Sequence, residues 1–99
     1  RIRSLVKDGD LRNWTPAAPM MMCGASSDPV VYFSNTTNMV DYWSDKLPAG
    51  VIRSLDITTN PLWPADTATA SIHGTTGIYC GLAGLQFFNG VRATLSAAQ

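Results

Sequence analysis

Glutamate is absent from this sequence, and charge of either sign is scarce. All seven acidic residues are aspartates, charged residues make up 14% of the 99 positions, and seven Lys and Arg residues balance the acids. Because typical globular chains are about 25% charged, this composition indicates a piece of a larger protein with much of its surface covered. The neutral balance also argues against a nucleic-acid partner, which requires a basic face that displaces counterions.

Long apolar runs are missing as well, and we expect no targeting signal in these residues. No stretch of about 18 apolar residues predicts a transmembrane helix. The first residues, Arg-Ile-Arg, form neither a signal peptide nor a native start. We therefore expect a processed, truncated or fragmentary chain, in which 99 residues allow one small domain.

Cysteine is scarce, with two residues, Cys23 and Cys80. No third or fourth ligand lies at a spacing typical of zinc sites, and we expect neither a metal ion nor a cofactor. By themselves the two cysteines fit either two buried free thiols or one disulfide. A disulfide would indicate an oxidising compartment.

The first part of the chain, residues 1–19, reads as a helix end, a turn at residues 8–10 and a linker. Pro16 and Pro19 favour extended backbone in the linker and stop any helix. Residues 20–99 carry the periodic apolar patterns, and we expect them to form the folded portion.

A strand–helix–strand pattern opens this folded portion. The apolar run at residues 20–25 and the β-branched run at residues 51–57 predict two strands. A helix is predicted between them, capped by Ser34 or Asn35 and running to about Lys46. Strands joined by such a helix are parallel, with a right-handed crossover.

A loop at residues 58–72 and a glycine-rich helix from Gly77 to about Leu95 complete the pattern. The apolar face expected to pack on the sheet consists of Ile78, Leu82, Leu85 and Phe88, widened by Phe87, Val91 and Leu95. Each glycine costs about 1 kcal/mol relative to alanine, which close packing on a sheet would explain. Two strands cannot form a stable sheet alone, so we expect an α/β fold that is incomplete on its own.

Two polar residues, Asp28 and His73, follow the two predicted strands. Neighbouring parallel strands end about 5 Å apart at one edge of a sheet, so the two side chains should meet there. An aspartate in such a position orients a histidine that acts as a general base. Local sequence alone favours a turn residue before Pro29 for Asp28 and an ordinary loop histidine for His73.

The order strand–Asp–helix–strand–His–helix matches the last two triad residues of an α/β-hydrolase. Residues 10–16, 22–33, 35–36 and 42–43 resemble the C-terminal part of bacterial secreted lipase/esterase-like α/β-hydrolases. In that family a Cys-Gly pair followed by Asp-Pro carries the catalytic acid. A later His-Gly-Thr carries the base, and a cysteine and a Phe-Phe pair follow in the last helix. The resemblance covers nearly the whole chain.

This resemblance implies the C-terminal βαβα portion of an α/β-hydrolase sheet, with Asp28 as catalytic acid and His73 as base. The substrates it implies are carboxylic esters, either lipids or short acyl esters. It also raises the expectation of a disulfide between Cys23 and Cys80, and hence of a secreted or periplasmic location.

The chain departs from the family at one point, because the nucleophile elbow Gly-x-Ser-x-Gly is absent. We therefore expect the serine to come from an N-terminal portion of the same hydrolase, and the isolated chain to be inactive. The alternative is a non-catalytic binding or structural α/β module, in which the Asp and His are inert.

Four apolar residues are candidates for substrate binding. Trp14 and Trp63 lie in loops expected to flank the acid and the base, as pocket walls or as core anchors. Val30 and Val31 follow the acid directly and are placed to line an acyl pocket. Trp43, on the apolar face of its helix, is expected in the core.

Overall fold

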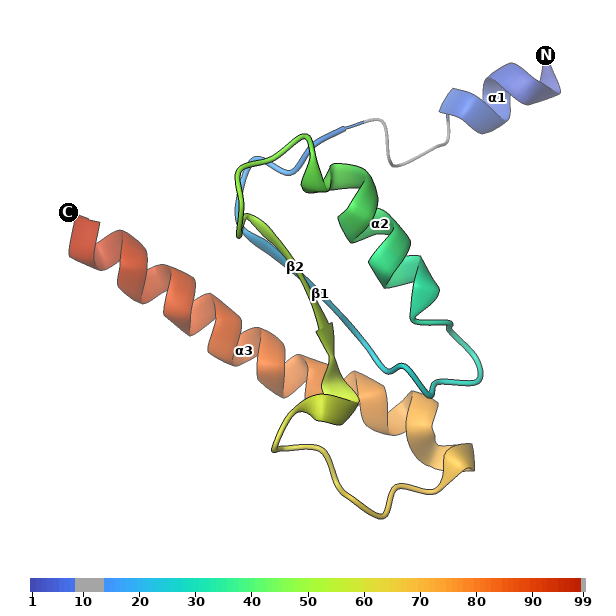
Figure 1. The fold of residues 1–99 in the computed structure, drawn as a ribbon, viewed down its shortest axis with the longest axis vertical. Coiled ribbons are helices and arrows are strands. Elements are labelled where there is room, and N and C mark those ends of the chain that lie inside the picture. The colour runs from blue at the N-terminus through green and yellow to red at the C-terminus, as the bar shows by residue number, and fades with distance from the viewer. Residues whose placement is uncertain (9–13, 99) are drawn as a thin grey trace.

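The computed structural model describes residues 1–8 and 14–98, and Figure 1 shows their arrangement. The turn expected at residues 8–10 falls largely outside the described residues. The helices and strands are α1 (Ile2–Asp8), β1 (Met20–Gly24), α2 (Ser34–Ser44), β2 (Ile52–Asp56) and α3 (Ile72–Ala98), with short 3-10 helices at Ile57–Thr59 and Thr69–Ser71.

The two strands form a parallel sheet, as the strand–helix–strand pattern predicts. Their register pairs Met20 with Ile52 at one end and Gly24 with Asp56 at the other. The strands lie between α2 and α3, and both helices contact the sheet (Figure 1). Because β1 and β2 end at the same edge, the loops that follow them begin side by side, which brings Asp28 and the region before α3 together.

A small core lies between the sheet and α3, near the carboxyl ends of the strands. Its buried members are Ala25, Ile57, Ile72 and Ala83, and partly buried side chains such as Leu55 and Tyr79 pack against them. Three of the four follow a strand directly or begin α3. The core therefore supports the same edge of the sheet at which Asp28 and His73 are placed.

The two strands are less covered than their apolar sequences predict. Every residue of β1 is half-buried, and Arg53 and Ser54 of β2 are exposed. The described residues extend 47 × 44 × 18 Å, so the molecule is thin along one axis. A layer this thin leaves both strands incompletely covered by the described residues.

The helix α2 begins at Ser34, within two residues of the prediction, but without the predicted cap. Phe33 occupies the cap position, no side chain there accepts a hydrogen bond, and Ser34 and Asn35 lie inside the helix. The Phe33 ring instead lies against the end of β1. A Cβ atom added to Gly24 would come within 2.9 Å of Phe33 Cδ2, so this close approach requires glycine.

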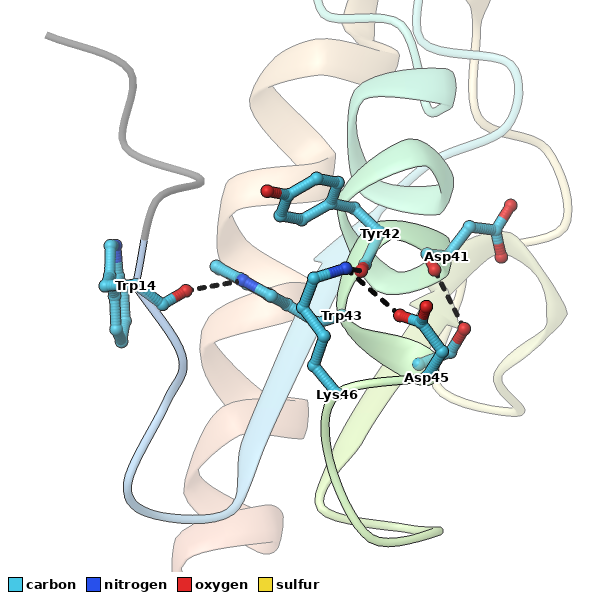
Figure 2. Close-up of polar contacts among 7 residues, drawn as sticks. Trp14, Asp41, Tyr42, Trp43, Asp45 and Lys46 are labelled. Atoms are coloured by element: carbon cyan, nitrogen blue, oxygen red, sulfur yellow. Dashed lines mark hydrogen bonds and ion pairs between the residues drawn. The ribbon is translucent and has the colours of Figure 1, made fainter. Parts of the chain in front are cut away.

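The far end of α2 is anchored by Trp43, which is 3% exposed and is thus buried, as predicted. Its Nε1 donates a hydrogen bond of 2.7 Å to the Trp14 carbonyl oxygen, and the two indole rings pack edge to face. Figure 2 shows this contact beside the Lys46 side chain, whose Nζ reaches the Tyr42 carbonyl oxygen and the Asp45 carboxylate. The contacts between Trp14 and Trp43 fix the linker before β1 to α2, whereas those of Lys46 stay within the end of the helix.

The last helix differs from the prediction in its start and in its buried face. It begins at Ile72, earlier than Gly77, so His73 lies in the first helical turn and not in a loop. The residues facing the sheet include Tyr79, Ala83 and Phe87, whereas most of the predicted face is exposed: Ile78, Leu82, Leu85, Phe88 and Leu95. The helix is apolar nearly all round, so periodicity could not select one stripe.

The helix glycines do not pack against this sheet. A Cβ atom added at Gly77, Gly81, Gly84 or Gly90 would meet nothing within 4 Å. This corrects the expectation of close packing on the sheet. Despite its length, α3 lacks the apolar character needed to cross a membrane, and so does every other helix among the described residues.

Candidate active site

The loop after β1, residues 25–31, carries the acid and is here called the acid loop. It begins with a tight turn in which the Asp28 N–H donates to the Ala25 carbonyl oxygen at 3.1 Å. Asp28 is 6% exposed and is the single buried polar residue in the described part of the chain. A buried carboxylate needs hydrogen-bond donors around it, and the acid loop supplies two of them.

The two carboxylate oxygens of Asp28 have separate partners. Oδ1 accepts hydrogen bonds from the backbone N–H groups of Val30 at 2.8 Å and Val31 at 3.2 Å. Oδ2 lies 2.9 Å from His73 Nδ1. Asp28 is therefore both a turn residue and the partner of the histidine, so the two interpretations of its sequence context hold together.

The hydrogen bond with His73 lowers the pKa of Asp28 below its ordinary value of 3.8. Burial acts in the opposite direction, and the N–H groups of Val30 and Val31 lower the pKa further. The net effect is a lowered pKa, so the Asp28 carboxylate is ionised at neutral pH. An ionised carboxylate can only accept hydrogen bonds, so His73 Nδ1 is the donor.

The His73 side chain is half exposed, while that of Asp28 is 4% exposed. Because Nδ1–H points to the carboxylate, the neutral ring keeps its lone pair on Nε2. The site thus holds an imidazole in one tautomer with a basic nitrogen that is not used by Asp28. This is the arrangement that a general base requires.

A disulfide joins the two elements that carry the pair. Cys23 in β1 is bonded to Cys80 in α3, with their Cα atoms 5.7 Å apart. The expectation that these cysteines lie close enough to bridge is confirmed. Cys23 precedes the acid loop and Cys80 follows His73, so the bond limits how far the acid and the base can separate.

A cavity of about 250 Å³ opens beside the acid–base pair. It lies between the end of β1, the start of α2 and the first turns of α3. Its lining residues are Cys23, Gly24, Asp28, Val31, Tyr32, Phe33, Thr36, His73, Thr76 and Gly77. Its walls are mixed, with apolar rings and two threonine side chains.

The structure separates the four residues predicted to bind substrate. Val31 lines the cavity, and Val30 is exposed beside it, with its N–H bound to Asp28. Trp63 packs edge to face on Tyr79 and contacts the core, so it acts as an anchor of the loop before α3.

Trp14 lies away from the acid–base pair, which corrects its expected position flanking the site. It precedes β1, packs on Trp43 and lines a separate cavity of about 420 Å³ with Met20, Met21 and Phe87. The reason is topological, because the linker enters the sheet at the amino end of β1 whereas the pair lies at the carboxyl end.

Sequence reasoning missed one residue at this edge, Asp56. It ends β2 just as Asp28 follows β1, and its Oδ1 accepts the Ser26 N–H of the acid loop at 3.1 Å. Its position at the carboxyl end of a predicted strand could have identified it, because functional side chains of parallel sheets lie at that end.

Comparison with protein-family models, with curated proteins and with solved structures finds no match to this chain. Within the described residues, no group of three or more His, Cys, Asp or Glu side chains is placed to hold a metal ion. The interpretation of the site therefore depends on its own geometry.

Proposed function

We propose that this chain supplies the acid and the base of a serine hydrolase that cleaves carboxylic esters. The observation that carries this proposal is the 2.9 Å contact between the buried Asp28 carboxylate and the Nδ1 of the half-exposed His73. The contact lies at the carboxyl edge of two adjacent parallel strands, where catalytic groups of open α/β sheets gather. The family resemblance of the sequence points to the same two residues.

In the proposed reaction His73 Nε2 takes the proton of a serine hydroxyl as that oxygen attacks the ester carbon. The same nitrogen then gives the proton to the leaving alcohol. Asp28 keeps the ring in the required tautomer and stabilises the imidazolium that forms. Water repeats the sequence to release the acid and to restore the serine.

The nucleophile in this proposal belongs to an N-terminal portion of the same hydrolase. Ser26 is close to the pair in the chain order, but its Oγ contacts Thr58 Oγ1 at 3.4 Å and its N–H donates to the Asp56 carboxylate. The exposed apolar residues of α3, such as Leu82 and Leu85, provide surface for that portion to cover.

Two further features support an ester hydrolase of an oxidising compartment. The Cys23–Cys80 disulfide is typical of secreted or periplasmic proteins. Val30, Val31 and Tyr32 form an exposed apolar rim directly after the acid. Such a rim suits the acyl chain of a lipid or a short ester.

The test joins residues 1–99 to the portion of the protein that carries the nucleophile and measures hydrolysis of a short p-nitrophenyl ester. Asp28→Asn is expected to reduce kcat by about 10⁴-fold, because the wrong histidine tautomer is then favoured. His73→Ala should abolish activity. Asp66→Asn, which changes an exposed loop aspartate, is the matched control and should leave activity unchanged.

A fluorophosphonate probe gives a second, independent readout. We expect it to label a serine outside residues 1–99, and only while His73 is present. Activity of the isolated chain, or full labelling in the His73→Ala variant, would contradict the proposal. Absence of any labelled serine in the complete protein would favour the non-catalytic module.

A further inference from the structure

We propose that Asp56 is a positioning residue that fixes the acid loop so that Asp28 stays within reach of His73. This inference rests on the proposed function, since it concerns the same acid–base pair. Asp56 forms hydrogen bonds with Ser26 and Thr58 and with neither Asp28 nor His73 among the described residues, so any effect it has on the pair passes through the backbone of the acid loop.

A single carboxylate oxygen of Asp56 accepts three hydrogen bonds. Its Oδ1 accepts the Ser26 N–H at 3.1 Å, the Thr58 N–H at 3.1 Å and the Thr58 hydroxyl at 2.7 Å. Two of these donors belong to the turn after β2, and one belongs to the acid loop. The carboxylate therefore ties the loop after one strand to the turn after the other.

The position of this link follows from the strand register. Gly24 and Asp56 are the last paired residues of β1 and β2, and the two chains diverge beyond them. The Ser26 N–H thus has no carbonyl of the neighbouring strand available to it. The Asp56 carboxylate takes the place of that carbonyl and extends the connection between the strands past the end of the ladder.

Holding Ser26 restricts the whole turn that leads to Asp28. Ser26 is the second residue of the turn closed by the Asp28 N–H and the Ala25 carbonyl oxygen. Ala25 is 1% exposed and belongs to the same buried cluster as Ile57, the residue after Asp56. The turn is thus fixed by apolar packing at its first residue and by a charged acceptor at its second.

The acceptor is ionised at neutral pH. Burial raises the pKa of Asp56, but the hydrogen bonds donated by Ser26 and Thr58 outweigh this effect and leave it below its ordinary value. Hydrogen bonds to an ionised acceptor are stronger than those between neutral groups. The carboxylate is therefore well suited to hold a backbone N–H at the open end of a sheet.

The experiment uses the full 99-residue chain, with its disulfide formed and its histidine labelled with ¹⁵N. His73 is the single histidine, so the imidazole signals are assigned without ambiguity. Two quantities are measured in dilute solution at neutral pH: the tautomer of His73 from its ring ¹⁵N shifts, and the hydrogen-exchange rate of the Ser26 amide.

Asp56→Ala removes the acceptor and is expected to accelerate Ser26 exchange by about tenfold or more. It should also lower the fraction of His73 in the Nδ1–H tautomer. Asp56→Asn keeps an acceptor oxygen at the same place and should restore most of both values. If Asp56 acted through its negative charge alone, Asp56→Asn would instead change both quantities as much as Asp56→Ala does. Asp66→Asn should change neither quantity.

Asp28→Asn distinguishes a failure of the proposed function from a failure of the role proposed for Asp56. If it leaves the His73 tautomer unchanged, the acid–base pair is absent, and both the proposed function and this inference are overturned. If it changes the tautomer but Asp56→Ala does not, only the role of Asp56 is overturned. Should Asp56→Ala fail to fold, Thr58→Val removes the shortest hydrogen bond to Asp56; unchanged Ser26 exchange and tautomer in that variant would overturn the proposal.

Discussion

Asp28 Oδ2 and His73 Nδ1 lie 2.9 Å apart, although 45 positions separate the two residues in the sequence. One side chain follows β1 and the other lies in the first turn of α3. The Cys23–Cys80 disulfide joins the same two elements. The acid–base pair is thus held by a covalent bond as well as by the sheet register and the acid loop.

The contribution of Asp28 to the stability of the fold should decrease at acidic pH. Its pKa in the folded chain is lower than the ordinary 3.8, so folding favours the ionised form. The stabilisation is fully present above the ordinary pKa and is lost as the pH falls through the lowered one. We expect the difference in unfolding free energy between wild type and Asp28→Asn to be constant above about pH 5 and to shrink below pH 4.

Urea unfolding at a series of pH values measures this difference. Asp66→Asn provides the control, because Asp66 is exposed and should give a small difference at every pH. A gap between wild type and Asp28→Asn that grew as the pH fell would contradict the assigned direction.

The disulfide should contribute strongly to the stability of so thin a molecule. It closes a loop with a sequence separation of 57, for which loop-closure entropy predicts about 4 kcal/mol. Replacing Cys23 and Cys80 together by serine should lower the melting temperature accordingly. Dithiothreitol should produce the same loss in wild type and no further loss in the double variant. Equal stability of reduced and oxidised wild type would contradict this prediction.

Gly24 should tolerate no side chain, in contrast to the glycines of α3. Gly24→Ala places a Cβ atom 2.9 Å from Phe33 Cδ2 and should displace that ring from the cavity beside His73, at a cost of about 1–3 kcal/mol. Gly81→Ala meets nothing within 4 Å and should stabilise the helix by about 0.5–1 kcal/mol. Thermal unfolding of both variants checks the opposite signs; stabilisation by Gly24→Ala would exclude the close contact.

The exposed apolar face of α3 should cause the isolated chain to self-associate. Leu82 and Leu85 are 45% and 59% exposed, whereas Ala83 between them is 5% exposed. Leu82→Lys with Leu85→Lys should reduce the apparent mass in light scattering and lower binding of a hydrophobic dye without unfolding the chain. Ala83→Lys should unfold it. A wild-type chain that stays monomeric at high concentration would contradict this prediction, because the apolar face of α3 would then be stable in contact with water.

The sequence was sufficient for the elements and their order. A continuous apolar run, a β-branched run and helical periodicity predicted β1, β2 and α2 to within a few residues, and the βαβ pattern predicted parallel strands. Asp28 and His73 were found because each follows a predicted strand. These features are local or follow from chain connectivity, so the pattern of residue types along the chain can predict them.

The tertiary structure decided which groups make contact. The Ser26–Asp56 link and the edge-to-face packing of Trp14 on Trp43 join segments far apart in sequence, and no local pattern specifies such pairings. The buried face of α3 was predicted wrongly because its residues are apolar on several sides. Periodicity ranks faces by polarity, whereas packing selects the face that fits the sheet and the Cys23–Cys80 bond. The sequence therefore determined the residues of the pair and predicted that they meet. Only the three-dimensional packing determined which of their atoms are in contact and that the Ser26–Asp56 link holds the acid loop beside them.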